Sequence, residues 1–450
     1  MKETKFKQTE VGMIPSDWEE KLLGEITDVR DGTHDSPKYY DIGYKFVTSK
    51  NLINGKIDFS NIQYISKIDF DKINERSKVD INDILFAMIG TIGNPVLITK
   101  EPDFAIKNVA LFKDKRCTNQ AYLKFYLSSA LALNRMLDDA KGSNQKFIPL
   151  SYFRSFLVPL PPTIEEQQRI ANALSDVDTL IANLEKLIDK KKNIKQGAMQ
   201  QLLTGKKRLP GFGSDERTGS RPTDERRKEC LSERSAKREV EESSGYKMTE
   251  LGMIPTDWEV KTISQVGKII GGGTPSTFNS AYWNGSVQWF TPAELSKAGK
   301  YVSKSERTIT KLGVENCSAK ILPAGTILLT TRASIGTSAI LKAPACTNQG
   351  FQSLVVNSEN SNEFLYYLLS TKVDEMMSLA SGSTFLEISP KKLGGIQLQI
   401  PSSRAEQTAI ANVLSDMDSE ISALETKLAK YRKLKTGMMQ QLLTGKIRLV

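Results

Sequence analysis

The feature that most constrains the fold of this 450-residue chain is a repeat whose two copies lie 240 residues apart. VGMIPSDWEEK at residues 11–21 returns as LGMIPTDWEVK at 251–261. The segment 165–209, which ends in QQLLTGKKRL, returns as 405–449, which ends in QQLLTGKIRL. Solenoid units are roughly 20–50 residues long, so this much longer period is typical of a whole module duplicated in tandem. The sequence therefore predicts two copies of one module.

The segments that close the two copies are predicted to be long helices. Each starts with an S/T-x-x-E capping box, Thr163 with Glu166 and Ser403 with Glu406, which satisfies free backbone N–H groups. Apolar residues then recur at alternating four- and three-residue steps, and such a heptad pattern requires a second helix along its length. These residues are Ile170, Leu174, Val177, Ile181, Leu184 and Ile188, and then Ile410, Leu414, Met417, Ile421, Leu424 and Leu428.

We expect the two helices to end at Gly197 and Gly437, which gives about 33 residues and about 50 Å each. A helix of that length does not belong to a compact core, so it is interpreted as a spacer. The other copy supplies a partner helix in the same chain, and the duplication favours an antiparallel, pseudo-two-fold arrangement. Residues 11–21 should then lie near the end of the second helix, and 251–261 near the end of the first.

The blocks between the repeated ends, about 22–160 and 262–400, diverge and are predicted to be mixed α/β with many short strands. Each contains a strand–turn–strand pattern with a glycine in a matching place, Gly93 or Gly336, followed by an amphipathic helix. These stretches are residues 83–98 and 119–137 in the first block, and 325–340 and 362–377 in the second. Residues 206–247 are dense in charges of both signs and are predicted to be a flexible linker.

Composition excludes several classes of function. Histidine is the usual metal ligand and general base, but the chain has only His34. The four cysteines, Cys117, Cys230, Cys317 and Cys346, never show a C-x-x-C spacing, which argues against zinc and against disulfides and favours a reducing cytoplasm. We expect neither a membrane span nor a secretory signal. GGGTPST at 271–277 lacks the lysine of a phosphate loop. We therefore expect no catalytic residue, metal or cofactor in this chain.

A net charge of +10 indicates a polyanionic partner, and loops of the divergent blocks carry residues suited to nucleic acid. Small residues allow a backbone to approach a phosphate, while hydroxyls, amides and arginine can bind base edges. The candidates are Thr33, His34, Ser36, Lys38, Lys50, Asn51, Asn144, Gln145, Lys146, Thr274, Ser276, Thr277, Arg332, Ser334, Asn348, Gln349, Ser383 and Thr384. Structural roles remain open: Arg332 can form an internal ion pair, and Asn348 and Gln349 can cap a turn.

The whole layout resembles the specificity subunit of Type I restriction-modification enzymes. The resemblance rests on GMIPxDWE opening and QQLLTGK closing each half, and on WNG at 283–285, TTRASIG at 330–336, NQGF at 348–351 and the repeated IANxLSDxD. The first half departs from it, because it has FAMIGTIG without the arginine, and IKNVAL where the second half has TNQGF.

This resemblance implies the following domains: a target recognition domain at 1–160, a long helix at 161–205, the linker at 206–247, a second recognition domain at 248–400 and a second helix at 401–450. Each recognition domain would read one half of a bipartite DNA target, and two antiparallel coiled-coil helices would set the unread spacer. Two methyltransferase subunits and two restriction/translocase subunits would bind the chain. S-adenosylmethionine, ATP and Mg²⁺ would belong to those partners.

Two other interpretations stay open. The chain could serve a different restriction system, whose partner is a fused methyltransferase-nuclease. Alternatively, it could be a scaffold without DNA, in which the duplicated helices only bring other proteins together.

Overall fold

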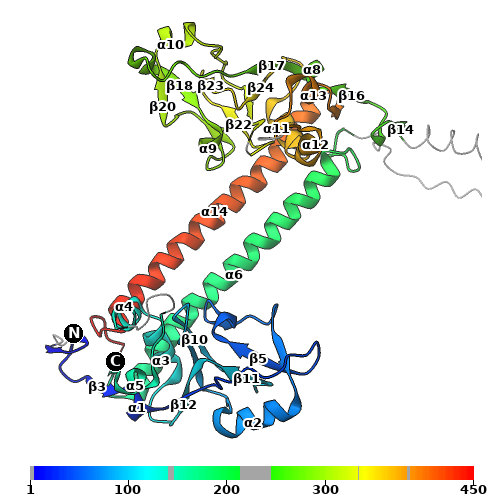
Figure 1. Cartoon of the computed structure of the whole chain (residues 1–450). Coiled ribbons are helices and arrows are strands. Elements are labelled where there is room, and N and C mark those ends of the chain that lie inside the picture. Colours follow the sequence, from blue (N-terminus) through cyan, green and yellow to red (C-terminus); the bar gives the residue numbers. More distant parts are fainter. Residues whose placement is uncertain (1–4, 140–145, 213–244, 333, 383–385, 450) are drawn as a thin grey trace, which may run out of the picture. The chain divides into compact units, whose positions relative to one another are not determined.

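The computed structural model describes residues 5–139, 146–212, 245–332, 334–382 and 386–449 (Figure 1). The chain forms two compact units: unit 1 comprises 1–187 with 424–450, and unit 2 comprises 188–423. Both units therefore take part of each long helix. Most of the expected linker, 213–244, lies outside the described residues. Within the described residues, no helix has the length and apolar character needed to cross a bilayer.

Unit 1 contains two main sheets. The first has the antiparallel order β10 (Gly93–Leu97), β9 (Ile84–Ala87), β12 (Val109–Asp114) and β4 (Thr27–Asp31). The second has the order β11 (Phe104–Lys107), β5 (Tyr44–Thr48) and β8 (Gln63–Ile65), in which β11 runs parallel to β5. Smaller pairs are β1 (Phe6–Thr9) with β2 (Gly12–Pro15), β3 (Glu19–Leu22) with β13 (Leu157–Leu160), and β6 (Leu52–Ile53) with β7 (Lys56–Ile57).

Unit 2 repeats this arrangement with one additional strand, β19, at the edge of its larger sheet. Its larger sheet has the order β17 (Gly267–Gly271), β24 (Gln352–Val356), β21 (Ile327–Leu329), β22 (Ser338–Leu341) and β19 (Tyr301–Val302). Its three-stranded sheet has the order β20 (Arg307–Ile309), β18 (Trp283–Phe290) and β23 (Cys346–Thr347), again with one parallel pair. The small pairs are β14 (Tyr246–Thr249) with β15 (Gly252–Pro255), and β16 (Trp258–Thr262) with β25 (Gln397–Pro401). The mixed α/β class and the internal repeat are confirmed.

Short helices complete each unit. In unit 1 they are α1 (Leu23–Ile26), η1 (Ser49–Asn51), α2 (Lys67–Ser77), α3 (Gln120–Leu127), α4 (Ala130–Asp138) and α5 (Leu150–Ser155). In unit 2 they are α8 (Ile263–Val266), η2 (Ser280–Tyr282), α9 (Pro292–Leu295), α10 (Lys311–Glu315), α11 (Asn362–Ser370), α12 (Val373–Leu379) and α13 (Pro390–Gly394). The single amphipathic helix expected over 119–137 is wrong, because the hydroxyl of Ser129 accepts from the Ala132 N–H and starts a second helix. The stretch 362–377 divides likewise into α11 and α12.

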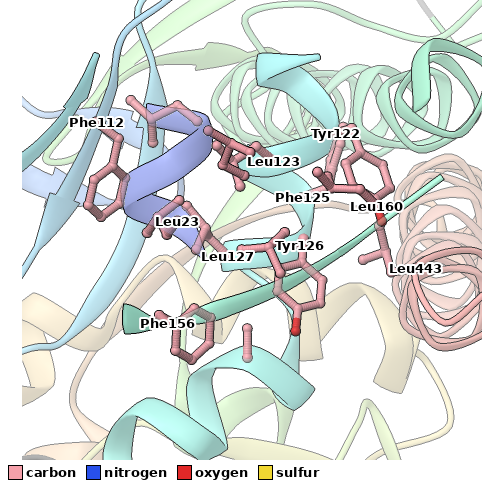
Figure 2. Close-up of a cluster of buried hydrophobic side chains, with 14 of the residues drawn as sticks. Leu23, Phe112, Tyr122, Leu123, Phe125, Tyr126, Leu127, Phe156, Leu160 and Leu443 are labelled. Carbon is pink, nitrogen blue, oxygen red and sulfur yellow. The ribbon is translucent and has the colours of Figure 1, made fainter. Parts of the chain in front are cut away.

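The core of unit 1 joins the globular domain to the end of the second long helix. Figure 2 shows Tyr122, Phe125 and Leu160 gathered beside Leu443, all of them almost fully buried. Unit 2 has the corresponding arrangement, in which Leu203 packs into the core with Trp258. The repeated QQLLTGK segments are therefore part of the two cores.

The long helices α6 (Ile164–Leu202) and α14 (Arg404–Leu442) have 39 residues each, about 58 Å at 1.5 Å per residue. The predicted ends at Gly197 and Gly437 are wrong, because both glycines lie within the helices. A helical glycine costs only about 1 kcal/mol relative to alanine. The apolar residues that follow each glycine reach a core and offset that cost. The heptad residues are buried or half-buried throughout, as predicted.

The two helices run antiparallel within each unit. In unit 1, Nζ of Lys435 lies 2.6 Å from the carboxylate of Asp178. In unit 2, the corresponding lysine, Lys195, pairs with Asp418 at 2.5 Å. Asp178 and Asp418 are the last residues of the two IANxLSDxD copies, so this motif supplies the carboxylate of an ion pair between the two helices in each unit.

Each unit closes on an arginine that follows the repeated QQLLTGK. In unit 1 the guanidinium of Arg448 binds both Asp17, at 2.9 Å, and the buried carboxylate of Glu166, at 2.5 Å. Arg208 makes the same two contacts in unit 2, with Asp257 and Glu406. The predicted contact between 11–21 and the end of the second helix is therefore confirmed, as is its counterpart in unit 2.

The same contacts correct the capping boxes. The Thr163 hydroxyl does accept from the Glu166 N–H, at 3.2 Å. The carboxylates of Glu166 and Glu406, however, accept from arginine and do not return to the backbone of Thr163 or Ser403.

Candidate nucleic-acid interface

Three glycine-containing loops of unit 2 meet where its two sheets approach each other. They are 271–277, 330–336 and 347–351. The Gly273 N–H donates to the Thr347 carbonyl at 2.9 Å, and the Thr331 N–H donates to the Gly350 carbonyl at 2.8 Å. A Cβ at Gly272 would lie 1.9 Å from the carbonyl oxygen of Asn348, so only glycine allows this approach. The loops that the sequence singled out in the second half thus form one cluster.

Within this unit 2 loop cluster, several candidate side chains hold the loops together. Oδ1 of Asn348 accepts from the Gly350 N–H at 2.9 Å, and the Thr274 hydroxyl donates to the side-chain carbonyl of Gln349. The Ser334 carbonyl accepts from Thr330. These contacts fit the turn-capping alternative. Ser276 and Thr277 are exposed on the same loop.

Arg332 forms an internal pair with Glu387. The two residues form an antiparallel bridge, and Nε of Arg332 lies 2.8 Å from the Glu387 carboxylate, although the N–H is not aligned with the oxygen. The arginine side chain keeps 42% of its surface exposed. The ion pair is partly exposed to solvent, so the exposed N–H groups of Arg332 remain available to a ligand.

Unit 1 gathers a corresponding cluster from loops 32–36 and 107–109, and loop 88–93 begins directly after Ala87, which pairs with Val109. Thr33 bridges Lys107 in parallel, and the Asn108 N–H donates to the Thr33 carbonyl at 3.2 Å. The His34 ring lies between Asp31 and Asn108, with ring nitrogens 2.8 and 2.7 Å from their oxygens. Nζ of Lys107 donates to the Ser36 hydroxyl. The only histidine is therefore a structural link within this cluster.

The other candidates of unit 1 divide between structural and exposed residues. Asn51 accepts from the Thr48 N–H at 2.9 Å and donates to the Asp58 carbonyl, so it stabilises the turn after β5. Lys38 lies 5.6 Å from the Tyr40 ring, while Lys50 and Lys146 are exposed. Asn144, Gln145, Ser383 and Thr384 lie outside the described residues.

One pair of positions differs in chemistry between the units. Ile89 bridges Phe147 in unit 1 as Arg332 bridges Glu387 in unit 2. The next hydrogen bond also matches, since the Ile148 N–H donates to the Met88 carbonyl and Ile388 donates to Thr331. An apolar pair in one unit thus replaces a charged pair in the other.

Two residues of unit 2 were missed by the sequence analysis. Glu387 is 55 residues from Arg332 in the chain, and no local motif links them. Arg307 lies with its Cζ 3.7 Å from the centre of the Trp283 ring, although 24 residues separate the two. The quoted WNG motif marked one member of this stack, but only the strand pairing of β18 with β20 reveals the other.

Candidate metal ligands and free thiols are scattered over the described residues. Among them, no group of three or more His, Cys, Asp or Glu is placed to hold a metal ion. Cys117, Cys317 and Cys346 are free thiols, and burial raises the pKa of Cys346 to about 12, which disfavours the reactive thiolate. What the two loop clusters present is hydroxyls, amides and basic side chains, which suit binding.

A family model described as the Type I restriction modification DNA specificity domain matches residues 15–196 and again 255–431. The chain belongs to this family. The two matches coincide with the two copies of the repeat.

Named relatives agree with this membership. The specificity subunit of the Type I restriction enzyme MjaIX of Methanocaldococcus jannaschii is 44% identical over 179 residues, which covers 39% of this chain and 41% of that protein. A putative MjaX specificity subunit from the same organism is 28% identical and covers 99% of this chain and 97% of the relative. The crystal structure of the S subunit of a Type I restriction-modification system from M. genitalium superposes with a TM-score of 0.55 at 16% identity, over 98% of both chains. That structure supports the fold.

Proposed function

We propose that this chain is the DNA-recognition subunit of a Type I restriction-modification complex and carries no catalytic site of its own. The observation that carries the proposal is the duplication itself: two units with the same core strand order, each with its own loop cluster, match a DNA specificity family twice. Each unit would read one half of a bipartite target. The different pairs at Ile89–Phe147 and Arg332–Glu387 support two different half-sites.

The long helices would set the unread spacer between the half-sites. Successive major-groove faces on one side of B-DNA lie about 34 Å apart, a distance that helices of this length can span. The proposed division into recognition domains at 1–160 and 248–400, helices at 161–205 and 401–450, and a linker at 206–247 belongs to the same model. The positive net charge would supply the salt-dependent, sequence-independent part of the affinity.

Two methyltransferase subunits would bind the repeated helix ends, and two restriction/translocase subunits would join them. Each unit has a matching cavity beside its helix end. The cavity in unit 1 is about 700 Å³ and includes Leu131, Met439 and Leu443 in its lining. The cavity in unit 2 is about 640 Å³ and includes Met199 and Leu203. In this model S-adenosylmethionine, ATP and Mg²⁺ belong to the partners, and the complex works in the cytoplasm.

Methylation mapping tests the proposal. The chain is produced with the methyltransferase subunit encoded beside it, and genomic methylation is read by single-molecule sequencing. We expect one motif with two specified halves and an unread spacer. A partner gene that encodes a fused methyltransferase-nuclease would favour the other restriction system. DNA binding without sequence preference or salt dependence, together with an unmethylated genome, would favour the scaffold.

A further inference from the structure

We propose that Arg307 anchors a DNA backbone phosphate on unit 2, held in place by Trp283. This inference rests on the proposed function and adds a contact that neither the candidate loops nor the repeat contains. Arg307 begins β20, at the edge of the three-stranded sheet, and pairs in register with Trp289 of β18. Because Arg307 belongs to a strand pair, the direction in which its side chain leaves the backbone is fixed. A residue on a mobile surface loop would have no such fixed direction.

The aromatic environment fixes the guanidinium. Its Cζ lies 3.7 Å from the centre of the Trp283 ring and 5.7 Å from that of Trp289. The two indoles meet edge to face at 88° and are 8% and 3% exposed, so neither can move away from the arginine. A guanidinium that lies over an indole ring at this distance is attracted to the ring face, and its N–H groups, which point outward from the guanidinium carbon, can still donate hydrogen bonds.

Arg307 has the charge and the exposure that a phosphate requires. The residue is exposed, and no carboxylate of the described residues forms an ion pair with it. Lys304, Lys311 and Lys320 are exposed on the segments that precede and follow β20. Arg332, in contrast, is already paired with Glu387. Binding of a phosphate to Arg307 therefore costs less free energy than binding to Arg332, because no internal ion pair has to be broken.

The stack also adjoins the unit 2 loop cluster. Nε1 of Trp289 donates to the Gly273 carbonyl at 2.9 Å, and Nε1 of Trp283 donates to the Ser276 carbonyl at 3.1 Å. The same two rings thus hold Arg307 and the loop that carries Thr274 and Thr277. A backbone phosphate bound by Arg307 would place a duplex against that loop, which is how phosphate contacts set the register of a protein on DNA.

Unit 1 has no arginine on the corresponding strand. β8, Gln63–Ile65, pairs with β5 as β20 pairs with β18, but the nearby stack is Tyr44 on Phe70, at 4.3 Å. The anchor is therefore specific to the second half of the molecule.

The test compares Arg307→Ala with the wild-type chain in complex with its methyltransferase subunit. Binding to a duplex that contains the mapped target is measured from low to high salt. We expect roughly tenfold weaker binding, as for loss of one charge-assisted hydrogen-bond pair, and a salt slope reduced by about one. The methylated motif should stay the same. Arg307→Lys keeps the charge but loses the planar fork, so it should retain the slope with an intermediate affinity.

Arg404→Ala is the matched control, since it removes one exposed arginine from the start of α14 in the same unit. Thermal unfolding should be unchanged in all three variants. Arg307→Ala binding equal to that of Arg404→Ala overturns the phosphate contact, and so does a motif relaxed at one position, which would assign base reading to Arg307. A wild-type complex without salt dependence or sequence preference would instead overturn the proposed function.

Discussion

At the scale of single residues, the arginines that close the units show how the repeat is built. Arg448 and Arg208 each neutralise a glutamate whose side chain is only 1–2% exposed. A buried carboxylate that loses its partner is strongly unfavourable, whereas exposed ion pairs contribute little. The sequence pattern placed both glutamates in capping boxes. Their actual partners could not be found from local spacing, because Arg208 is 198 residues from Glu406 and Arg448 is 282 residues from Glu166.

We expect Arg448→Ala to destabilise unit 1 by about 3 kcal/mol, since it leaves Glu166 buried without a counter-charge. Arg208→Ala should do the same to unit 2. Hydrogen exchange measures both, because the first variant should expose 11–22 and the second 251–262. Arg432→Ala, which breaks the exposed pair with Glu185, is the control and should cost less than about 1 kcal/mol. Equal effects from all three would contradict this account.

Asp17 makes part of this closure dependent on pH. The hydrogen bond from Arg448 lowers the pKa of Asp17 below its ordinary value of 3.8, despite some desolvation. A carboxyl with a lowered folded pKa stabilises the fold above its unfolded pKa, and that contribution is lost as the pH falls through the folded value. Unfolding midpoints of the wild type should therefore fall more steeply below about pH 4 than those of Asp17→Asn. Parallel pH profiles would rule out this role of Asp17.

Substitutions at the matching positions Arg332 and Ile89 should each change one half of the recognised DNA sequence. Arg332→Ala removes the arginine of the charged bridge and should alter or relax the half of the methylated motif that unit 2 reads, by about 1–3 kcal/mol of discrimination. Ile89→Ala, at the matching place in unit 1, should change only the other half. Methylation sequencing of both variants gives the result. If either variant changes both halves, the units do not read independently.

At the scale of elements, periodic patterns predicted more than turns did. The heptads of α6 and α14, the strand–turn–strand patterns and the matching glycines Gly93 and Gly336 are all present, since each follows from local spacing. The division of 119–137 into two helices was missed, because Ser129 can either continue a helix or cap one. The loop clusters of the two units depend on contacts between loops that are distant in the sequence. The sequence could therefore predict which residues are candidates for binding, but not which residues they contact.

The helical glycines offer a direct test at this scale. A Cβ at Gly197 or Gly437 would meet no atom within 4 Å, so alanine there should stabilise the protein by about 0.5–1 kcal/mol. Gly205 and Gly445 are the controls, because both have positive φ and a Cβ would lie 2.5 Å from Pro255 or 2.3 Å from Pro15. Alanine at these two positions should destabilise. Thermal unfolding compares the four variants, and destabilisation by Gly197→Ala would contradict the open helix surface.

At the scale of the whole molecule, both units draw on the same two helices. Unit 1 takes the start of α6 and the end of α14, and unit 2 takes the remainder. The carboxylates of the two IANxLSDxD motifs each form an ion pair between the helices, one in each unit. A change of helix length between the Asp178–Lys435 and Asp418–Lys195 ion pairs would leave the contacts inside each unit intact. Such a change therefore tests the role of the helices separately from that of the recognition domains.

Inserting one heptad between residues 187 and 188 and another between 423 and 424 should therefore lengthen the unread spacer. Seven helical residues add about 10 Å, which corresponds to about three base pairs at 3.4 Å each. The heptad phase is kept, so both helices can still pair along their length. An insertion in α6 alone should abolish methylation, because it shifts the Asp178–Lys435 pair out of register with Asp418–Lys195. A doubly extended protein that methylates the original motif with its original spacer would show that the helices do not set the distance.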